Sequence, residues 1–77
     1  MGSIVRNGFR LAVYPNDHRP PHCHVLVDRV EIRISLTQPP SLLSVRGKAT
    51  RQQVSGALLA VAHDLFKLQI LWSRYHE

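Results

Sequence analysis

The chain has 77 residues, 44% hydrophobic and 19% charged, which suits one small globular domain and excludes a disordered segment. Ten Lys and Arg residues against five acidic ones give a net charge of +5, so the class of partner that this charge favours is anionic, such as nucleic acid or an acidic protein. No apolar run reaches the roughly 20 residues of a membrane span, and the N-terminus lacks a signal-peptide pattern. We therefore expect a cytoplasmic protein with no membrane contact. Its single cysteine, Cys23, cannot pair within the chain, which fits a reducing compartment.

The first part of the chain predicts a small antiparallel sheet. Strands are expected at residues 8–14, 22–28 and 30–36, with a fourth, edge strand at 41–45. In the first of them Phe9, Leu11 and Val13 alternate with more polar positions, as in a half-buried strand, and Pro15 ends it. The preceding seven residues are expected to be only a short lead-in.

The second and third of these strands predict a hairpin with Asp28-Arg29 as a two-residue loop. A loop of this length fixes the register. The expected pairs are Val27 with Val30, Leu26 with Glu31, Val25 with Ile32, His24 with Arg33, Cys23 with Ile34 and His22 with Ser35. One face of the hairpin is then wholly apolar, which places Cys23 in the core, and the other face carries the polar chemistry.

The C-terminal third predicts one long helix over residues 51–75. Thr50 and Gln53 form a capping box at its start. Apolar residues recur at spacings of three and four along a first stripe: Val54, Leu58, Val61, Leu65, Leu68, Trp72 and Tyr75. A second stripe beside it contains Leu59, Ala62, Phe66 and Ile70. His63 and His76 are expected to be surface residues.

The expected fold is therefore α+β: a single domain, residues 1–77, with a three- to four-stranded antiparallel sheet covered on one face by a long C-terminal helix. A helix of this length spans about 37 Å, whereas six- or seven-residue strands span about 20 Å. Two alternatives follow. Either the helix bends near His63-Asp64, or its second stripe is covered by a partner protein or by a second copy of the chain.

Three of the five histidines, His18, His22 and His24, lie within seven residues around a Pro-Pro step. His22 and His24, two apart on a strand, are about 6.5 Å apart at Cα and point the same way, so they can hold one divalent metal such as Zn²⁺. His18 is about 12 Å away along an extended chain and joins them only if the loop turns back, for example at Pro20. Asp17 or Glu31 is the alternative carboxylate ligand.

The same residues also fit proton transfer without a metal. His22 and His24 would act as general acid and base, and Arg33, opposite His24, would stabilise a phosphate group. This set of catalytic residues is what a small ribonuclease needs. A third interpretation is purely structural, with the Pro-Pro-His loop as a rigid entry to the strand and the histidine rings bonded to neighbouring groups.

The loop reads Asn16-Asp17-His18-Arg19-Pro20-Pro21-His22-Cys23-His24-Val25. It resembles the N-[DE]-H-x-P-P-H-x-H-V signature of an uncharacterised bacterial family of short proteins with a domain of unknown function. The likeness extends to Gly8-Phe9-Arg10 and to Trp72-x-x-Tyr75-His76, and so covers nearly the whole chain. In place of the Gly-containing hairpin turn expected of relatives, this chain has Asp28-Arg29. The resemblance implies a toxin–antitoxin-like gene pair, with a cognate small partner protein, and implies no reaction.

Three functional hypotheses follow. The first is a toxin-like module acting on RNA, with His22, His24 and Arg33 as catalytic residues. The second is a non-enzymatic antitoxin or adaptor, which requires the second helical stripe to be exposed. The third is a small metal-binding protein that uses His18, His22 and His24, which requires His18 to fold back.

Overall fold

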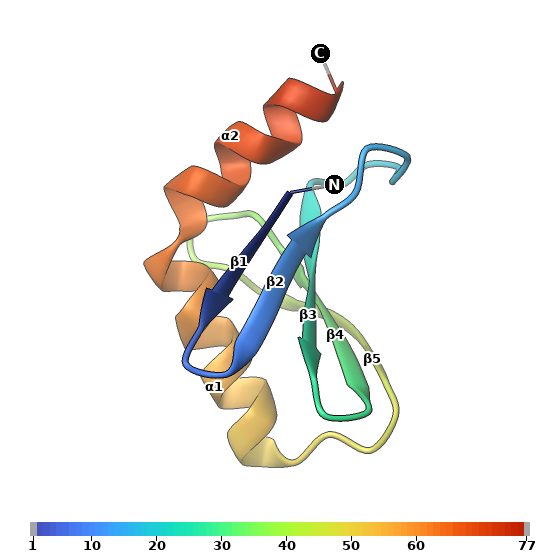
Figure 1. The fold of residues 1–77 in the computed structure, drawn as a ribbon, viewed down its shortest axis with the longest axis vertical. Helices are drawn as coiled ribbons and strands as arrows, with labels where there is room; N and C mark the ends of the chain where they lie inside the picture. The colour runs from blue at the N-terminus through green and yellow to red at the C-terminus, as the bar shows by residue number, and fades with distance from the viewer. Residues whose placement is uncertain (1, 77) are drawn as a thin grey trace.

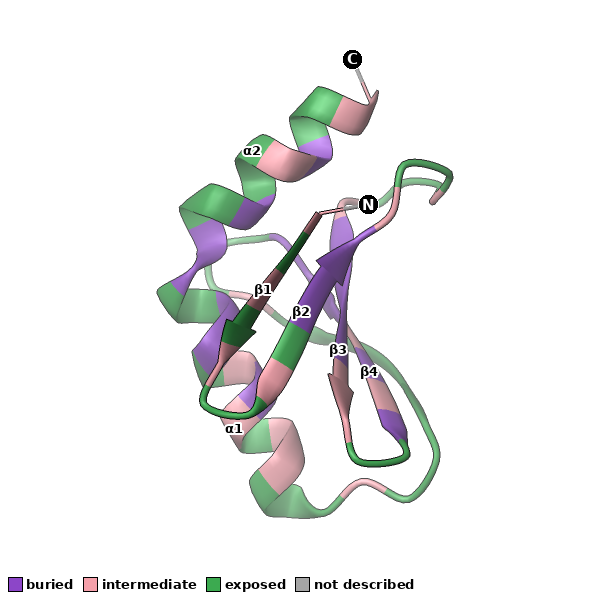
Figure 2. Ribbon diagram, in the orientation of Figure 1, coloured by how far each residue is buried: buried purple, intermediate pink, exposed green. Residues whose placement is uncertain are grey.

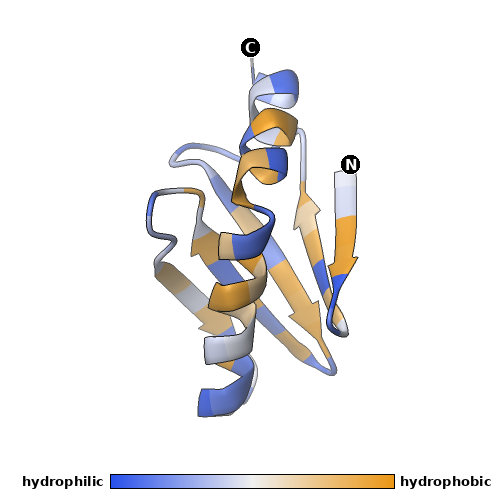
Figure 3. Cartoon of the chain, turned by 90° about the vertical axis from the view of Figure 1, so that its left-hand side faces the viewer, coloured by the Kyte–Doolittle hydropathy of each residue, from blue (hydrophilic) through white to orange (hydrophobic). Residues whose placement is uncertain are grey.

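The computed structural model describes residues 2–76. Five strands are followed by two helices: β1 (Gly2–Arg6), β2 (Phe9–Val13), β3 (His22–Val27), β4 (Val30–Ser35), β5 (Leu42–Arg46), α1 (Arg51–His63) and α2 (Leu65–His76). The strands form one antiparallel sheet in chain order, each paired with the next. Both helices lie on the same side of this sheet (Figure 1), and they cross its face when the molecule is seen from the helix side (Figure 3). The α+β class is confirmed.

The sheet has one strand more than the sequence predicted. The segment expected to be a lead-in forms β1, which pairs with β2 from Gly2↔Val13 to Arg6↔Phe9. The loop between them is Asn7-Gly8, with φ angles of 53° and 82°. Asn-Gly is the strongest sequence signal for a two-residue hairpin turn, because these residues tolerate positive φ at both positions. This signal was present in the sequence and was missed.

The predicted hairpin of β3 and β4 is confirmed pair by pair, from His22↔Ser35 to Val27↔Val30. Its loop contains neither Gly nor Asn, but Asp28 adopts a φ of 52°. Aspartate is among the few non-glycine residues that enter this region readily, because its short side chain bonds locally. The fourth predicted strand also forms, as β5 at the sheet edge.

The predicted single helix is wrong, whereas the alternative of a bend near His63-Asp64 is found. α1 begins at the predicted capping box and ends before Asp64, and the two helices are bent by 75°. The carboxylate of Asp64 is buried and accepts two hydrogen bonds from the Arg6 guanidinium, at 2.9 and 3.1 Å. A long-range ion pair with β1 thus holds the chain at the bend, and both helices keep their apolar sides on the sheet.

The core lies between the sheet and the helices. Buried residues concentrate in the central strands and on the sheet-facing sides of the helices (Figure 2). They include Leu11, Val13, Cys23, Val25, Ile32, Ile34, Ala57, Val61, Leu65, Leu68 and Trp72. The first helical stripe therefore packs inward as predicted. Within residues 2–76 no single helix is long and apolar enough to cross a membrane, although α1 and α2 taken together meet the length and composition requirement despite their bend.

The ion pair at the bend predicts a pH-dependent contribution to stability. The Arg6 hydrogen bonds hold the pKa of Asp64 below its ordinary value. A carboxyl group whose pKa is lower in the folded than in the unfolded state stabilises the fold at pH values above its unfolded-state pKa. This stabilisation is lost as the pH falls through its folded-state pKa. Asp64→Asn is expected to lower the Tm by about 5–10 °C at pH 7.

Thermal unfolding of wild type and Asp64→Asn across pH checks this expectation. The difference in Tm should shrink as the pH falls through the lowered pKa of Asp64, where the wild-type carboxyl becomes protonated too. Asp28→Asn is the control, because Asp28 is exposed in the hairpin loop. A Tm difference that stays constant down to the lowest pH would contradict the ion pair as its cause.

Candidate metal centre

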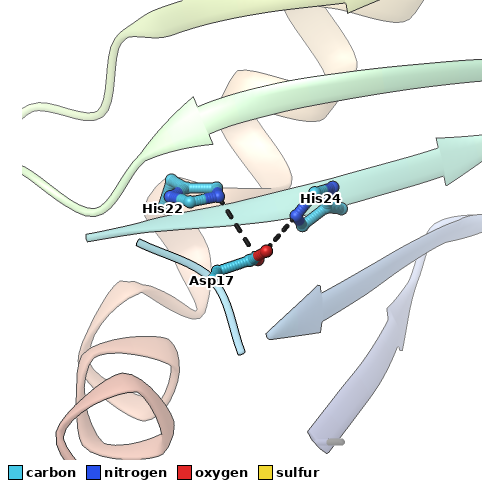
Figure 4. Close-up of side chains that lie close together, drawn as sticks. All are labelled: Asp17, His22 and His24. Atoms are coloured by element: carbon cyan, nitrogen blue, oxygen red, sulfur yellow. Dashed lines mark hydrogen bonds and ion pairs between the residues drawn. The ribbon is translucent and has the colours of Figure 1, made fainter. Parts of the chain in front are cut away.

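The loop between β2 and β3 returns over the start of β3. Its Arg19–Pro20 peptide bond is cis, and Asp17 lies beside the two histidines of β3. Asp17 Oδ2 is 2.8 Å from His24 Nε2 and 3.3 Å from His22 Nε2. The carboxylate thus sits between the two rings (Figure 4). The expectation that His22 and His24 project to the same side of β3 is met.

The second nitrogen of each ring is held by a different acceptor. His22 Nδ1 donates to the carbonyl oxygen of Pro20 at 2.7 Å. His24 Nδ1 donates to Glu31 Oε2 at 3.2 Å. Both partners are acceptors only, so each Nδ1 carries the proton that it donates, and each Nε2 faces Asp17. The two imidazoles are therefore oriented as metal-binding histidines usually are, with a carboxylate or carbonyl behind each.

The two rings are more deeply buried than the sequence predicted. His22 is 8% and His24 6% exposed, whereas an open polar face was expected. The reason is aromatic cover from outside the strand. Tyr14 packs edge-on against His24 at 4.7 Å between ring centroids, and Trp72 of α2 lies 5.4 Å from His22. The rings are enclosed by polar and aromatic groups, so they are not simply part of the aliphatic core.

The C-terminal end of α2 fixes the loop that carries Asp17. His76 Nε2 bonds to the backbone oxygen of Asp17 at 2.8 Å, and its Nδ1 bonds to the backbone oxygen of Trp72 at 2.8 Å. The His76 ring also stacks on Trp72 at 3.7 Å. His76 was predicted to be a surface residue. Its spacing of four residues from Trp72 at a helix end indicates that the two side chains lie close together. Its hydrogen bond to the Asp17 backbone in the loop could not be recognised from the sequence. His63 is exposed as expected.

Asp17, His22 and His24 are the group within residues 2–76 whose ligand atoms converge, all within 4.8 Å of one another. Two ligands at about 2.0–2.1 Å from one ion are roughly 2.9 Å apart in an octahedral site and roughly 3.4 Å apart in a tetrahedral one. The distances from Asp17 Oδ2 to the two ring nitrogens, 2.8 and 3.3 Å, are close to these ligand–ligand separations. The two histidine nitrogens would close to a similar spacing around an ion.

The structure does not bring His18 into this group. Its side chain is exposed on the loop. The neighbouring residue, Asp17, lies beside His22 and His24, where the three-histidine hypothesis placed His18. Cys23 lies on the opposite, core face of β3, and burial raises the pKa of its thiol to about 12, so it offers no thiolate. The metal-ligating set that the geometry supports is therefore two histidines and one carboxylate, the carboxylate alternative of the sequence analysis.

An open cleft of about 530 Å³ borders the site. Its lining residues are Asp17, His18, Arg19, Pro20, His22, Arg33, Leu43 and Ser44. Asp17 and His22 belong both to the converging group and to the cleft wall, so a small ligand in the cleft can reach the site. A centre with three protein ligands and access to a cleft has the arrangement of a catalytic rather than a purely structural metal site.

The acid–base hypothesis fits this geometry less well. Arg33 lies opposite His24 as predicted and lines the cleft. However, both nitrogens of His24 face carboxylates, Asp17 on one side and Glu31 on the other. His24 is also not among the residues that line the cleft, so its ring is not placed to exchange a proton with a substrate there.

Comparison of the chain with protein-family models, with curated proteins and with solved structures gave no match. The resemblance of the loop motif to a bacterial family therefore stays a prediction.

Proposed function

We propose that this protein binds one divalent transition metal, Zn²⁺ in the first place, through Asp17, His22 and His24. The observation that carries the proposal is the orientation of the rings. Both Nε2 atoms and one carboxylate oxygen face a common point, while both Nδ1 atoms are held from behind by Pro20 and Glu31. These bonds from behind hold each ring with Nε2 towards Asp17, the orientation in which Nε2 would bind a metal.

The charge of the site also favours a cation. His24 contacts a carboxylate at each ring nitrogen, Glu31 at Nδ1 and Asp17 at Nε2, so two negative groups lie beside one ring. A metal ion bound at Nε2 would give Asp17 a positive partner. Two imidazoles and one carboxylate suit Zn²⁺ and other divalent first-row metals. Such an ion, when bound, would supply Lewis-acid chemistry at the cleft.

Titration of the metal-free protein with Zn²⁺ tests the proposal. One ion per chain is expected, with an affinity that falls as pH is lowered, because protons compete for the histidine nitrogens. His18→Ala is expected to bind Zn²⁺ like the wild type, since its ring lies outside the converging group. No binding above pH 7 would end the proposal, and a loss of binding in His18→Ala would instead support the ligand set with three histidines.

A second candidate function, binding of a partner protein, is favoured by the second helical stripe. Leu59 of α1 is 69% exposed, and Phe66 and Ile70 of α2 are 75% and 39% exposed. Exposed large apolar side chains are a feature of protein contact surfaces. A cognate small protein in the cytoplasm, as the toxin–antitoxin-like resemblance implies, or a second copy of the chain would cover this stripe. Sedimentation that finds only monomers at every concentration, with or without the product of any small gene encoded beside this one, would exclude this function.

A further inference from the structure

The face of the sheet opposite the helices is rich in arginine. Residues paired across antiparallel strands point to the same face. One row of pairs across the sheet is Arg10, Leu26, Glu31 and Arg46, and the adjacent row is Ala12, His24, Arg33 and Ser44. The helices cover the other face (Figure 3). The uncovered face therefore carries three arginines beside the metal-site histidines and a single acidic residue in these rows, Glu31, which is bonded to His24.

Two cations line the cleft itself. Arg33 enters from β4 and Arg19 from the loop that carries Asp17. Within residues 2–76, the ion pairs of arginine side chains involve Arg6 and Asp64 alone, so no described carboxylate neutralises Arg19 or Arg33. Arg33 is half-buried and Arg19 is exposed. An arginine without a carboxylate partner offers its full set of donors to an external anion, and the guanidinium fork fits phosphate oxygens.

We propose that the cleft binds a phosphodiester group of a nucleic-acid strand, held by Arg33 and Arg19 next to the metal ligands Asp17 and His22. Contact of this phosphate with an ion rests on the proposed function above, whereas the arginine contacts do not. Arg10 and Arg46 extend the positive face beyond the cleft, so a chain of phosphates gains more than a single one. This extension favours a strand over a free phosphate ion.

Fluorescence anisotropy with a labelled single-stranded RNA of about 12 nucleotides, a length that spans a typical single-strand site, tests the inference. We expect Arg33→Gln to weaken binding about 10-fold and to reduce the salt slope by about 0.7, the value for one phosphate contact on a single strand. The matched control is Arg51→Gln, which removes the same charge from an exposed position at the start of α1. Its effect should be less than about two-fold.

The possible outcomes separate the two proposals. Equal weakening by Arg33→Gln and Arg51→Gln would mean unspecific attraction to net charge and would overturn the cleft site. If inorganic phosphate competes as strongly as unlabelled RNA at the same concentration of phosphate groups, the ligand is a free phosphate and not a nucleic-acid strand. RNA binding that depends on Arg33 in protein that binds no Zn²⁺ would support the cleft and refute the metal centre. Zn²⁺ binding without any RNA or single-stranded DNA binding would support the metal centre and refute the nucleic-acid site in the cleft.

Discussion

Trp72→Ala is expected to lower the free energy of unfolding by about 3–5 kcal/mol, the usual loss for a large aromatic removed from a core. Trp72 is 5% exposed and belongs to the core cluster between the sheet and α2. It also contacts His22 and stacks on His76. A domain of this size has a total stability of only about 4–10 kcal/mol, so the variant should be largely unfolded at 37 °C or close to it.

Urea unfolding followed by far-UV circular dichroism measures this loss, because fluorescence would change with the tryptophan itself. The matched control is Phe66→Ala, an aromatic truncation in the same helix at a position that is 75% exposed. It should change the stability by less than about 0.5 kcal/mol. Similar losses in the two variants would show that α2 does not pack on the sheet through the stripe that contains Trp72.

His24→Gln is expected to weaken Zn²⁺ binding by at least about 100-fold, because it removes a proposed ligand. Loss of a group that only hydrogen-bonds to a ligand already costs about 10- to 100-fold. Glutamine keeps much of the side-chain volume and can bond to one of the two carboxylates that now contact His24, Asp17 or Glu31. The fold should therefore persist, which the far-UV spectrum of the variant checks.

The control for this variant is His63→Gln, which changes an exposed histidine away from the site and should leave the affinity unchanged. Competition titration with a coloured chelator gives both affinities. If His24→Gln binds Zn²⁺ as tightly as the wild type, His24 is not a ligand. The cluster of His24 with Asp17 and Glu31 would then be a structural network of charged hydrogen bonds.

Local patterns in the sequence determined several parts of this fold. Alternating residues and a two-residue loop specified the β3–β4 register, and the spacing of Thr50 and Gln53 specified the start of α1. These features depend on neighbours two to four positions apart, so they can be recognised in a linear sequence. The same kind of signal, Asn7-Gly8, encoded the missed hairpin of β1 and β2.

The sequence by itself also identified the histidine loop and offered Asp17 as one alternative ligand. Only the tertiary structure places Asp17, rather than His18, beside His22 and His24, because this placement depends on how the loop closes onto β3. The contacts that close it join distant positions: His76 with the backbone of Asp17, and Arg6 with Asp64 at the helix bend. Each spans nearly sixty residues along the chain. No periodicity or spacing encodes such pairs, since they form only when the packing of both helices on the sheet brings these distant residues together.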